Sequence, residues 1–236
     1  MKVVLISHTL DPEAIVAAAI NQCYSAKSGE ELKEEISSEK RERLIDIVMN
    51  SGHLSTIEHA SFTFAVEGVS RITETQLVRH RIASYSIKSG RYNKTHTNFI
   101  VPPKIQENEK ARELVEKFKK SLEKTISELE KLSFKYEDMR YLTPQGTATN
   151  IIFTMNARSL LNFFEHRLCL RAQSEIRSLA VEMLKLVKPV APNIFKFAGP
   201  TCEIEKICWE GDLSCGRWKG IKGGELRTRN VKKSSD

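Results

Sequence analysis

The chain has 236 residues, of which 40% are hydrophobic and 28% are charged, so it is long enough to bury the core of one domain, or at most two. No apolar run in the sequence approaches the ~20 residues of a membrane-spanning helix, and the opening residues turn acidic too early for a signal peptide, so we expect a cytoplasmic protein without a membrane partner. The net charge of +7 is concentrated in residues 217–236, which hold seven Lys/Arg against two acidic residues. This segment predicts a flexible basic tail after a domain of residues 1–216. With Trp218 as its one aromatic residue, it lacks the pattern of a nucleic-acid-binding surface.

The first part of the chain predicts a strand, two helices and a second strand. A weakly alternating run at residues 3–7 is typical of a strand, and Asp11, placed directly before a proline, is a typical helix start. Residues 38–50 form an amphipathic pattern that a glycine ends. We expect its inward side chains to be Leu44, Ile45, Ile47 and Val48. Alternation at residues 61–66 predicts the second strand.

A cluster of basic and hydroxyl residues follows at residues 79–92. Residues 70–78 predict a helix, and its C-terminal end carries the adjacent Arg79, His80 and Arg81, while the later Ser/Gly run predicts a loop. Guanidinium groups bind phosphate bidentately, and hydroxyls and backbone N–H groups fill the remaining lone pairs, so the segment suits an anionic ligand. Neighbouring helical side chains point about 100° apart, so the three basic residues cannot all contact one phosphate. The alternative is a helix end whose cations are solvated and favour the negative end of the helix dipole.

The second half of the chain is mostly helical. Residues 107–132 predict a long amphipathic helix, residues 149–155 a strand, and residues 157–170 and 172–187 two further helices. Helices that alternate with a few strands favour an α+β fold.

One helix carries a polar stripe. Arg158, Asn162 and His166 recur every four residues and therefore share a face of the helix at residues 157–170. Buried polar side chains need partners. The stripe therefore either binds something or faces solvent, and its apolar neighbours favour the first.

The chain has five cysteines, and an odd number without a secretory signal favours reduced thiols. Cys202, Cys208 and Cys215 are separated by five and six residues, which does not match the tight pairs of common zinc sites. A metal would need a fourth ligand such as Cys169 or His166 folded alongside. We expect no metal, and small, at least half-buried thiols instead.

Four separated motifs closely resemble those of the flavin-dependent thymidylate synthases. The first is Arg-His-Arg-x-x-Ser at residues 79–84, with Ser-Gly-Arg-Tyr at 89–92. The others are Gly-His-x-Ser-x-x-Glu-His at 52–59, Asn-Ala-Arg-x-Leu at 156–160 and Arg-Ala-Gln-x-Glu-Ile-Arg at 171–177. The resemblance implies a single α+β domain with a central sheet flanked by helices, assembled as a homotetramer with shared active sites.

The resemblance also implies the reaction. A member of this family methylates dUMP to dTMP, with methylenetetrahydrofolate as the one-carbon donor and with FAD, reduced by NADPH, as the hydride carrier. The unrelated flavin-free thymidylate synthases use a cysteine nucleophile, and we expect none here. The sequence shows no Gly-x-Gly-x-x-Gly fingerprint for the dinucleotide. A non-catalytic protein that binds phosphate or RNA through the same basic segment is the rival class.

Residue roles follow from the matched motifs. The resemblance assigns FAD to Ser55, Glu58, Arg79, His80, Arg81, Asn156, Arg158 and Asn162. It assigns dUMP to Gln76, Arg79, Ser89, Gly90, Arg91, Arg140 and Arg167. Arg167 is also expected to act in catalysis by favouring negative charge on the pyrimidine, and His53 near the flavin and folate. For Arg140, a salt bridge with Asp138 or Glu137 is the structural alternative.

Overall fold

The structure is a computed structural model that describes residues 1–92, 98–221 and 223. The chain divides into two compact units. Unit 1 comprises Met1–Val4 and Phe64–Phe153, and unit 2 comprises Leu5–Thr63 and Thr154–Asp236. In the described residues four strands form one sheet in the order β1-β2-β4-β3. The strands are β1 Lys2–His8, β2 Ser61–Ser70, β3 Ser84–Ile87 and β4 Ala148–Asn156.

Neighbouring strands of the sheet are antiparallel. The end of β1 meets the start of β2, where the Thr9 N–H donates to the Ser61 carbonyl at 2.9 Å. Thr63 near the start of β2 bonds Thr154 near the end of β4 through their hydroxyls at 2.9 Å. The Lys88 N–H, just after β3, donates to the Asn150 carbonyl early in β4 at 2.9 Å. This register confirms the predicted α+β class.

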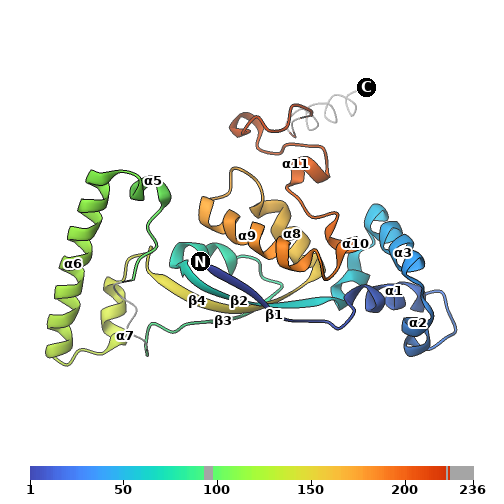
Figure 1. Cartoon of the computed structure of the whole chain (residues 1–236), viewed down its shortest axis with the longest axis horizontal. Coiled ribbons are helices and arrows are strands. Elements are labelled where there is room, and N and C mark those ends of the chain that lie inside the picture. The colour runs from blue at the N-terminus through green and yellow to red at the C-terminus, as the bar shows by residue number, and fades with distance from the viewer. Residues whose placement is uncertain (93–97, 222, 224–236) are drawn as a thin grey trace, which may run out of the picture. The chain divides into compact units, whose positions relative to one another are not determined.

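The described helices of unit 1 lie between residues 71 and 142. They are α4 Arg71–Leu77, α5 Pro103–Gln106, α6 Glu109–Lys131, α7 Tyr136–Met139 and the 3-10 turn η2 Arg140–Leu142. The predicted long helix is confirmed as α6, which lies beside α7 (Figure 1). Its Leu122 and Ile126 are buried with Met139. In the N-terminal half of the same stripe, Leu114 is 65% exposed and Phe118 54% exposed, so the buried part of the stripe is its C-terminal half.

Unit 2 holds the other helices. They are α1 Pro12–Gln22, α2 Gly29–Glu35, α3 Ser38–Ser51, η1 Leu54–His59, α8 Ala157–Arg167, α9 Ser174–Val187, α10 Pro192–Phe195, α11 Thr201–Ile204 and η3 Gly211–Leu213. Figure 1 shows α1, α2 and α3 gathered together, and α8 beside α9. Asp11 caps α1 as predicted, since its carboxylate accepts the Ala14 N–H at 3.2 Å.

Two predictions about local structure are wrong. The Ser/Gly run contains β3, in which Ser84 and Ser86 are exposed while Tyr85 and Ile87 are half-buried. Hydrogen bonding to β4 and the partial burial of these alternate residues outweigh the loop-like composition. In α3, Ile47 is 53% exposed, because a helix that buries Ile45 and Val48 turns the residue between them outward.

None of the described helices is both long enough and apolar enough to cross a membrane. Residues 222 and 224–236 of the predicted basic tail lie outside the described residues.

Candidate active site

The polar residues of α4 are placed by its N-cap. The Ser70 hydroxyl accepts the Thr73 N–H at 3.1 Å, which fixes where the helix begins. Arg71 in the first turn contacts Glu74 at 2.7 Å and reaches the Lys88 carbonyl at 3.4 Å. Thr75 lies one turn later on the same face. This face of α4 therefore presents a guanidinium and a hydroxyl toward the chain that follows β3.

A pocket of about 410 Å³ in unit 1 lies at this face. Its lining residues are Arg71, Thr75, Gly90, Arg140, Tyr141, Thr143, Pro144 and Gln145. A Cβ atom built on Gly90 would lie 3.4 Å from Nη2 of Arg71 and 3.8 Å from Cβ of Arg140. Gly90 therefore lies between two arginines, and its missing side chain leaves the space open. Two guanidiniums beside hydroxyl groups suit an anionic oxygen ligand.

Arg91, the next residue, makes a different contact. Its Nη2 and Nε atoms both bond one carboxylate oxygen of Glu137, at 2.8 and 3.2 Å. These hydrogen bonds hold the pKa of the Glu137 carboxyl below its ordinary value. The Ser89 hydroxyl accepts the Arg91 N–H at 3.2 Å. Glu137 thus forms a salt bridge with Arg91, and not with Arg140 as the structural alternative proposed.

Tyr85 holds the segment that contains Arg79, His80 and Arg81. The Tyr85 hydroxyl lies 2.9 Å from the Leu77 carbonyl and 2.8 Å from the His80 carbonyl. Having one proton, it donates to one of them at a time. Burial raises the pKa of Tyr85 to about 12, so the phenol stays protonated. The carbonyls at the end of α4 are therefore tied to β3, while Arg79 and Arg81 remain exposed and His80 is half-buried.

The residues assigned to FAD in unit 2 come from η1 and α8, which contact each other. Arg158 on α8 pairs with Glu58 on η1 at 2.6 Å. Ser55 on the same 3-10 turn is exposed. Asn156 is the N-cap of α8, since its side chain accepts the Ser159 N–H at 2.9 Å. The structure thus places Glu58 and Arg158 in contact, and the side chain of Asn156 serves as the N-cap of α8.

The polar stripe of α8 faces outward. Arg158, Asn162 and His166 are all exposed, and the Asn162 amide lies 3.4 Å from Nε2 of His166. The buried side of the helix consists of Ala157, Leu160, Phe163 and Phe164. In the described chain the stripe is therefore open to a ligand.

The two residues assigned to catalysis both belong to unit 2. Arg167 is the last residue of α8 and is half-buried, and this burial lowers the pKa of its guanidinium. An arginine so placed still carries its charge at neutral pH. His53 is exposed and is the N-cap of η1. The remaining residues assigned to dUMP lie in unit 1.

Six residues of this pocket were not assigned from the sequence, among them Arg71, Thr75 and Gln145. A signal was present for two of them, because Arg71, Thr75 and Arg79 are spaced four residues apart. This spacing marks one helical face. Gln145 lies in a turn, where spacing carries no comparable information.

The cysteines are free thiols in the described structure, with Cys208 buried and Cys23 and Cys215 exposed. The described residues that line the pocket beside α4 include no cysteine.

Comparison with known proteins gives consistent results. Residues 4–193 match the family model of the thymidylate synthase complementing protein. The chain is 47% identical to the flavin-dependent thymidylate synthase of Clostridium tetani, over 94% of this chain and 96% of that protein. It is 45% identical to the one from Geobacter sulfurreducens, over 94% and 97%. Its fold is similar to a crystal structure of flavin dependent thymidylate synthase from Helicobacter pylori complexed with FAD and dUMP. The TM-score is 0.64 at 25% identity, and the match covers 84% of this chain and 100% of that chain.

Proposed function

This chain belongs to the flavin-dependent thymidylate synthases and is an enzyme of that family, and from this premise we propose that it methylates dUMP to dTMP. Methylenetetrahydrofolate is the proposed one-carbon donor and NADPH the proposed reductant. Bound FAD would act as the hydride carrier, a role for which amino-acid side chains lack the chemistry. Membership of an enzyme family argues against the non-catalytic rival. The cytoplasmic location stays a prediction.

The pocket beside α4 supports a site for the nucleotide. We assign the dUMP phosphate to Ser89, Arg91 and Arg140, with Gly90 leaving room for it. Arg140 and Gly90 already line one pocket with Arg71, and this observation carries the proposal. Arg91 would join them by exchanging the Glu137 carboxylate for a phosphate oxygen. Gln76, three residues before Arg79 on one helix face, offers an amide to the pyrimidine edge.

The exposed stripe on α8 supports a site for FAD. Its Arg158 can bind a phosphate of the dinucleotide, while Asn162 and the Ser55 hydroxyl can hydrogen-bond polar atoms of the cofactor. Arg158 pairs with Glu58 at 2.6 Å on this exposed surface, so the two side chains assigned to the cofactor lie together. Arg79, His80 and Arg81 are assigned to the same cofactor from unit 1. In the proposed homotetramer, groups from different subunits complete each site.

Arg167 is the proposed catalytic cation. Its guanidinium would lie near the pyrimidine and stabilise the negative charge that develops on the ring as the new bond forms. Partial burial strengthens this effect, because solvent screens the charge less. His53 would contact the flavin and folate. No cysteine nucleophile is required, and the cysteine-free lining of the described nucleotide pocket supports this part of the proposal.

The experiment that tests the cofactor assignment is a flavin titration of the Arg158→Ala variant. We expect the purified protein to bind FAD, and the variant to bind it roughly tenfold or more weakly, because a charge-assisted hydrogen bond contributes about 1.5–3 kcal/mol. Arg177→Ala on α9 is a matched control, since Arg177 bonds the Leu170 carbonyl and carries no proposed ligand contact. Equal FAD affinity in wild type and Arg158→Ala would contradict the assignment.

A further inference from the structure

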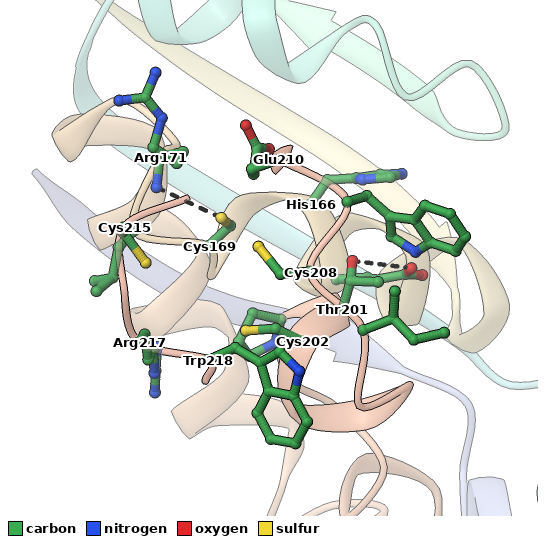
Figure 2. Close-up of a pocket in the computed structure, with 15 residues that line it drawn as sticks. His166, Cys169, Arg171, Thr201, Cys202, Cys208, Glu210, Cys215, Arg217 and Trp218 are labelled. Atoms are coloured by element: carbon green, nitrogen blue, oxygen red, sulfur yellow. Dashed lines mark hydrogen bonds between the residues drawn. The ribbon is translucent and has the colours of Figure 1, made fainter. Parts of the chain in front are cut away.

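The cavity after α8 and the pocket beside α4 differ in the charge of their walls. The cavity after α8 has a volume of about 70 Å³ and is shown in Figure 2. Its lining holds two arginines, Arg171 and Arg217, and two glutamates, Glu165 and Glu210. Burial raises the pKa of the Cys202 thiol in the same wall, so this thiol is neutral at pH 7. The described wall of this cavity therefore has no excess charge for an ionic ligand.

The pocket beside α4 has an excess of positive charge. The described residues that line it include Arg71 and Arg140 and no acidic side chain. The proposed function assigns Arg140 and Gly90 to the phosphate of dUMP, but it gives Arg71 no role. An inference about Arg71 therefore rests on that proposed function.

The backbone of Arg71 is anchored to the turn that precedes β4. Its N–H donates to the Thr147 carbonyl at 3.0 Å, and the N–H of Ile72 donates to the Gln145 carbonyl at 3.2 Å. These two N–H groups of the first turn of α4 are thus paired within unit 1. What Arg71 offers to the pocket is its side chain.

The guanidinium of Arg71 has a held side and an open side. Its Nη1 atom bonds the Glu74 carboxylate at 2.7 Å, in a pair whose side chains are 29% and 15% exposed. Its Nη2 atom contacts the Lys88 carbonyl at 3.4 Å, which is long for a hydrogen bond. A guanidinium carries five N–H donors. Arg71 can therefore bind a ligand on the Nη2 side without releasing Glu74.

The open side of this guanidinium is directed at Gly90. A Cβ atom built on Gly90 would lie 3.4 Å from Nη2 of Arg71 and 3.8 Å from Cβ of Arg140. The space that the missing side chain leaves open is thus bordered by both arginines. An ionised phosphate accepts hydrogen bonds from several guanidinium donors at once, and this space is where the proposed function places it.

Thr75, the other α4 residue in the described lining, does not fill the same role. Its hydroxyl donates to the Arg71 carbonyl at 2.8 Å. An ionised phosphate offers acceptor oxygens, so it needs donors, and the Thr75 proton is already used inside the helix. Arg71 is therefore the donor that α4 brings to the pocket lining.

We propose that Arg71 binds the phosphate of dUMP together with Arg140, from the two sides of Gly90, and that Glu74 positions the Arg71 guanidinium for this contact. The phosphate is then held by Arg71 in addition to the residues that the matched motifs assign to it. Arg71 is a binding residue and takes no part in the transfer of the one-carbon unit.

Calorimetric titration of Arg71→Met with dUMP tests the proposal. Methionine keeps an unbranched stem and removes the charge, so dUMP should bind about tenfold more weakly, as expected for the loss of a charge-assisted hydrogen bond. Arg41→Met is the matched control, because Arg41 is similarly buried, with 24% of its side chain exposed, and pairs with Asp11 at 2.8 Å away from this pocket. We expect dUMP affinity within about twofold of wild type in the control, and FAD affinity within about twofold in both variants.

Arg71→Lys keeps the test valid if Arg71→Met does not fold. Lysine retains the charge but loses the planar fork that matches phosphate geometry, so dUMP should bind about two- to fivefold more weakly. Affinity equal to wild type in a folded Arg71 variant would overturn the inference and leave the proposed function intact. A wild-type protein that binds no dUMP would overturn both.

Inorganic phosphate shows which part of the nucleotide Arg71 contacts. It should compete with dUMP for the wild-type protein, and its inhibition constant should rise about tenfold in Arg71→Met, in parallel with the loss of dUMP affinity. A variant that binds dUMP more weakly while phosphate competes as well as in wild type would show that Arg71 does not hold the phosphate.

Discussion

At the scale of residues, Glu137 competes with the proposed ligand for Arg91. The pair is partly exposed, with 49% of the Arg91 side chain and 38% of the Glu137 side chain open to solvent. Exposed ion pairs contribute little to stability and exchange readily. A nucleotide phosphate, which carries more charge than a carboxylate, can therefore displace Glu137 without disturbing the fold.

This competition predicts the effect of Glu137→Gln. The neutral amide binds Arg91 less strongly, so dUMP should bind about two- to fivefold more tightly to the variant. Calorimetric titration with dUMP measures this. Asp138→Asn is the matched control, because it removes the same charge at the neighbouring position without touching the Arg91 contact. Unchanged or weaker dUMP binding in Glu137→Gln would show that Arg91 does not hold the nucleotide.

Some residues of the candidate site could be predicted from the sequence and others could not. The motif order identified Gly90 and Arg140, and both line the same pocket. Asn156 was assigned to the cofactor, which stays a prediction, and in the described structure its side chain also caps α8. The N-cap role was readable from an Asn before a helix. Arg71 was missed because its neighbours in space, Gly90 and Arg140, are distant in the chain.

At the scale of elements, Tyr85 connects β3 to the end of α4. Its hydroxyl lies within hydrogen-bond distance of the carbonyls of Leu77 and His80. These two residues come before and after Arg79 in the sequence. The alternating pattern of β3 was hidden by its serines, so the strand that carries this tyrosine was predicted as a loop. Strands β2 and β4, in contrast, were predicted correctly, β2 from the alternation of Phe62, Phe64 and Val66 with smaller residues and β4 from its β-branched and aromatic composition.

Tyr85→Phe should lower the free energy of unfolding by about 1 kcal/mol, since the part-buried carbonyls of Leu77 and His80 lose the hydroxyl donor. The pKa of Tyr85 is about 12, above the ~10 of an unfolded tyrosine. Folding therefore favours the neutral phenol, and its contribution is complete below pH ~10 and is lost as the pH rises toward 12. Denaturant unfolding at pH 8 and pH 11 measures this. A difference between wild type and variant that is equal at both pH values would contradict the role of the phenol.

At the scale of the whole molecule, the family match at residues 4–193 runs through both units. The assigned dUMP and FAD residues all lie within it. The segment after residue 193 carries Cys202, Cys208, Cys215 and the basic tail. Composition alone suggested that the tail is separate from the domain, and the residues after 223 lie outside the described structure. The boundary at residue 216 stays a prediction.

Truncation after Gly223 tests the role of the remaining tail. The backbone of Gly223 bonds the Cys208 carbonyl at 2.8 Å, so the cut is placed after the last described contact. We expect the truncated enzyme to keep its rate of dTMP formation within about twofold, because no assigned residue is removed. A truncated protein that binds FAD and dUMP normally but has lost turnover would show that the tail takes part in the reaction.

The most direct test of the proposed function is a single-turnover reaction with flavin-loaded protein. dUMP and methylenetetrahydrofolate are added to the enzyme after NADPH has reduced its FAD, and the nucleotide product is separated and identified. We predict that dTMP forms in an amount set by the bound flavin, and that the flavin-free protein forms none. Absence of dTMP from protein that binds both FAD and dUMP, or equal dTMP formation without flavin, would contradict the proposed reaction.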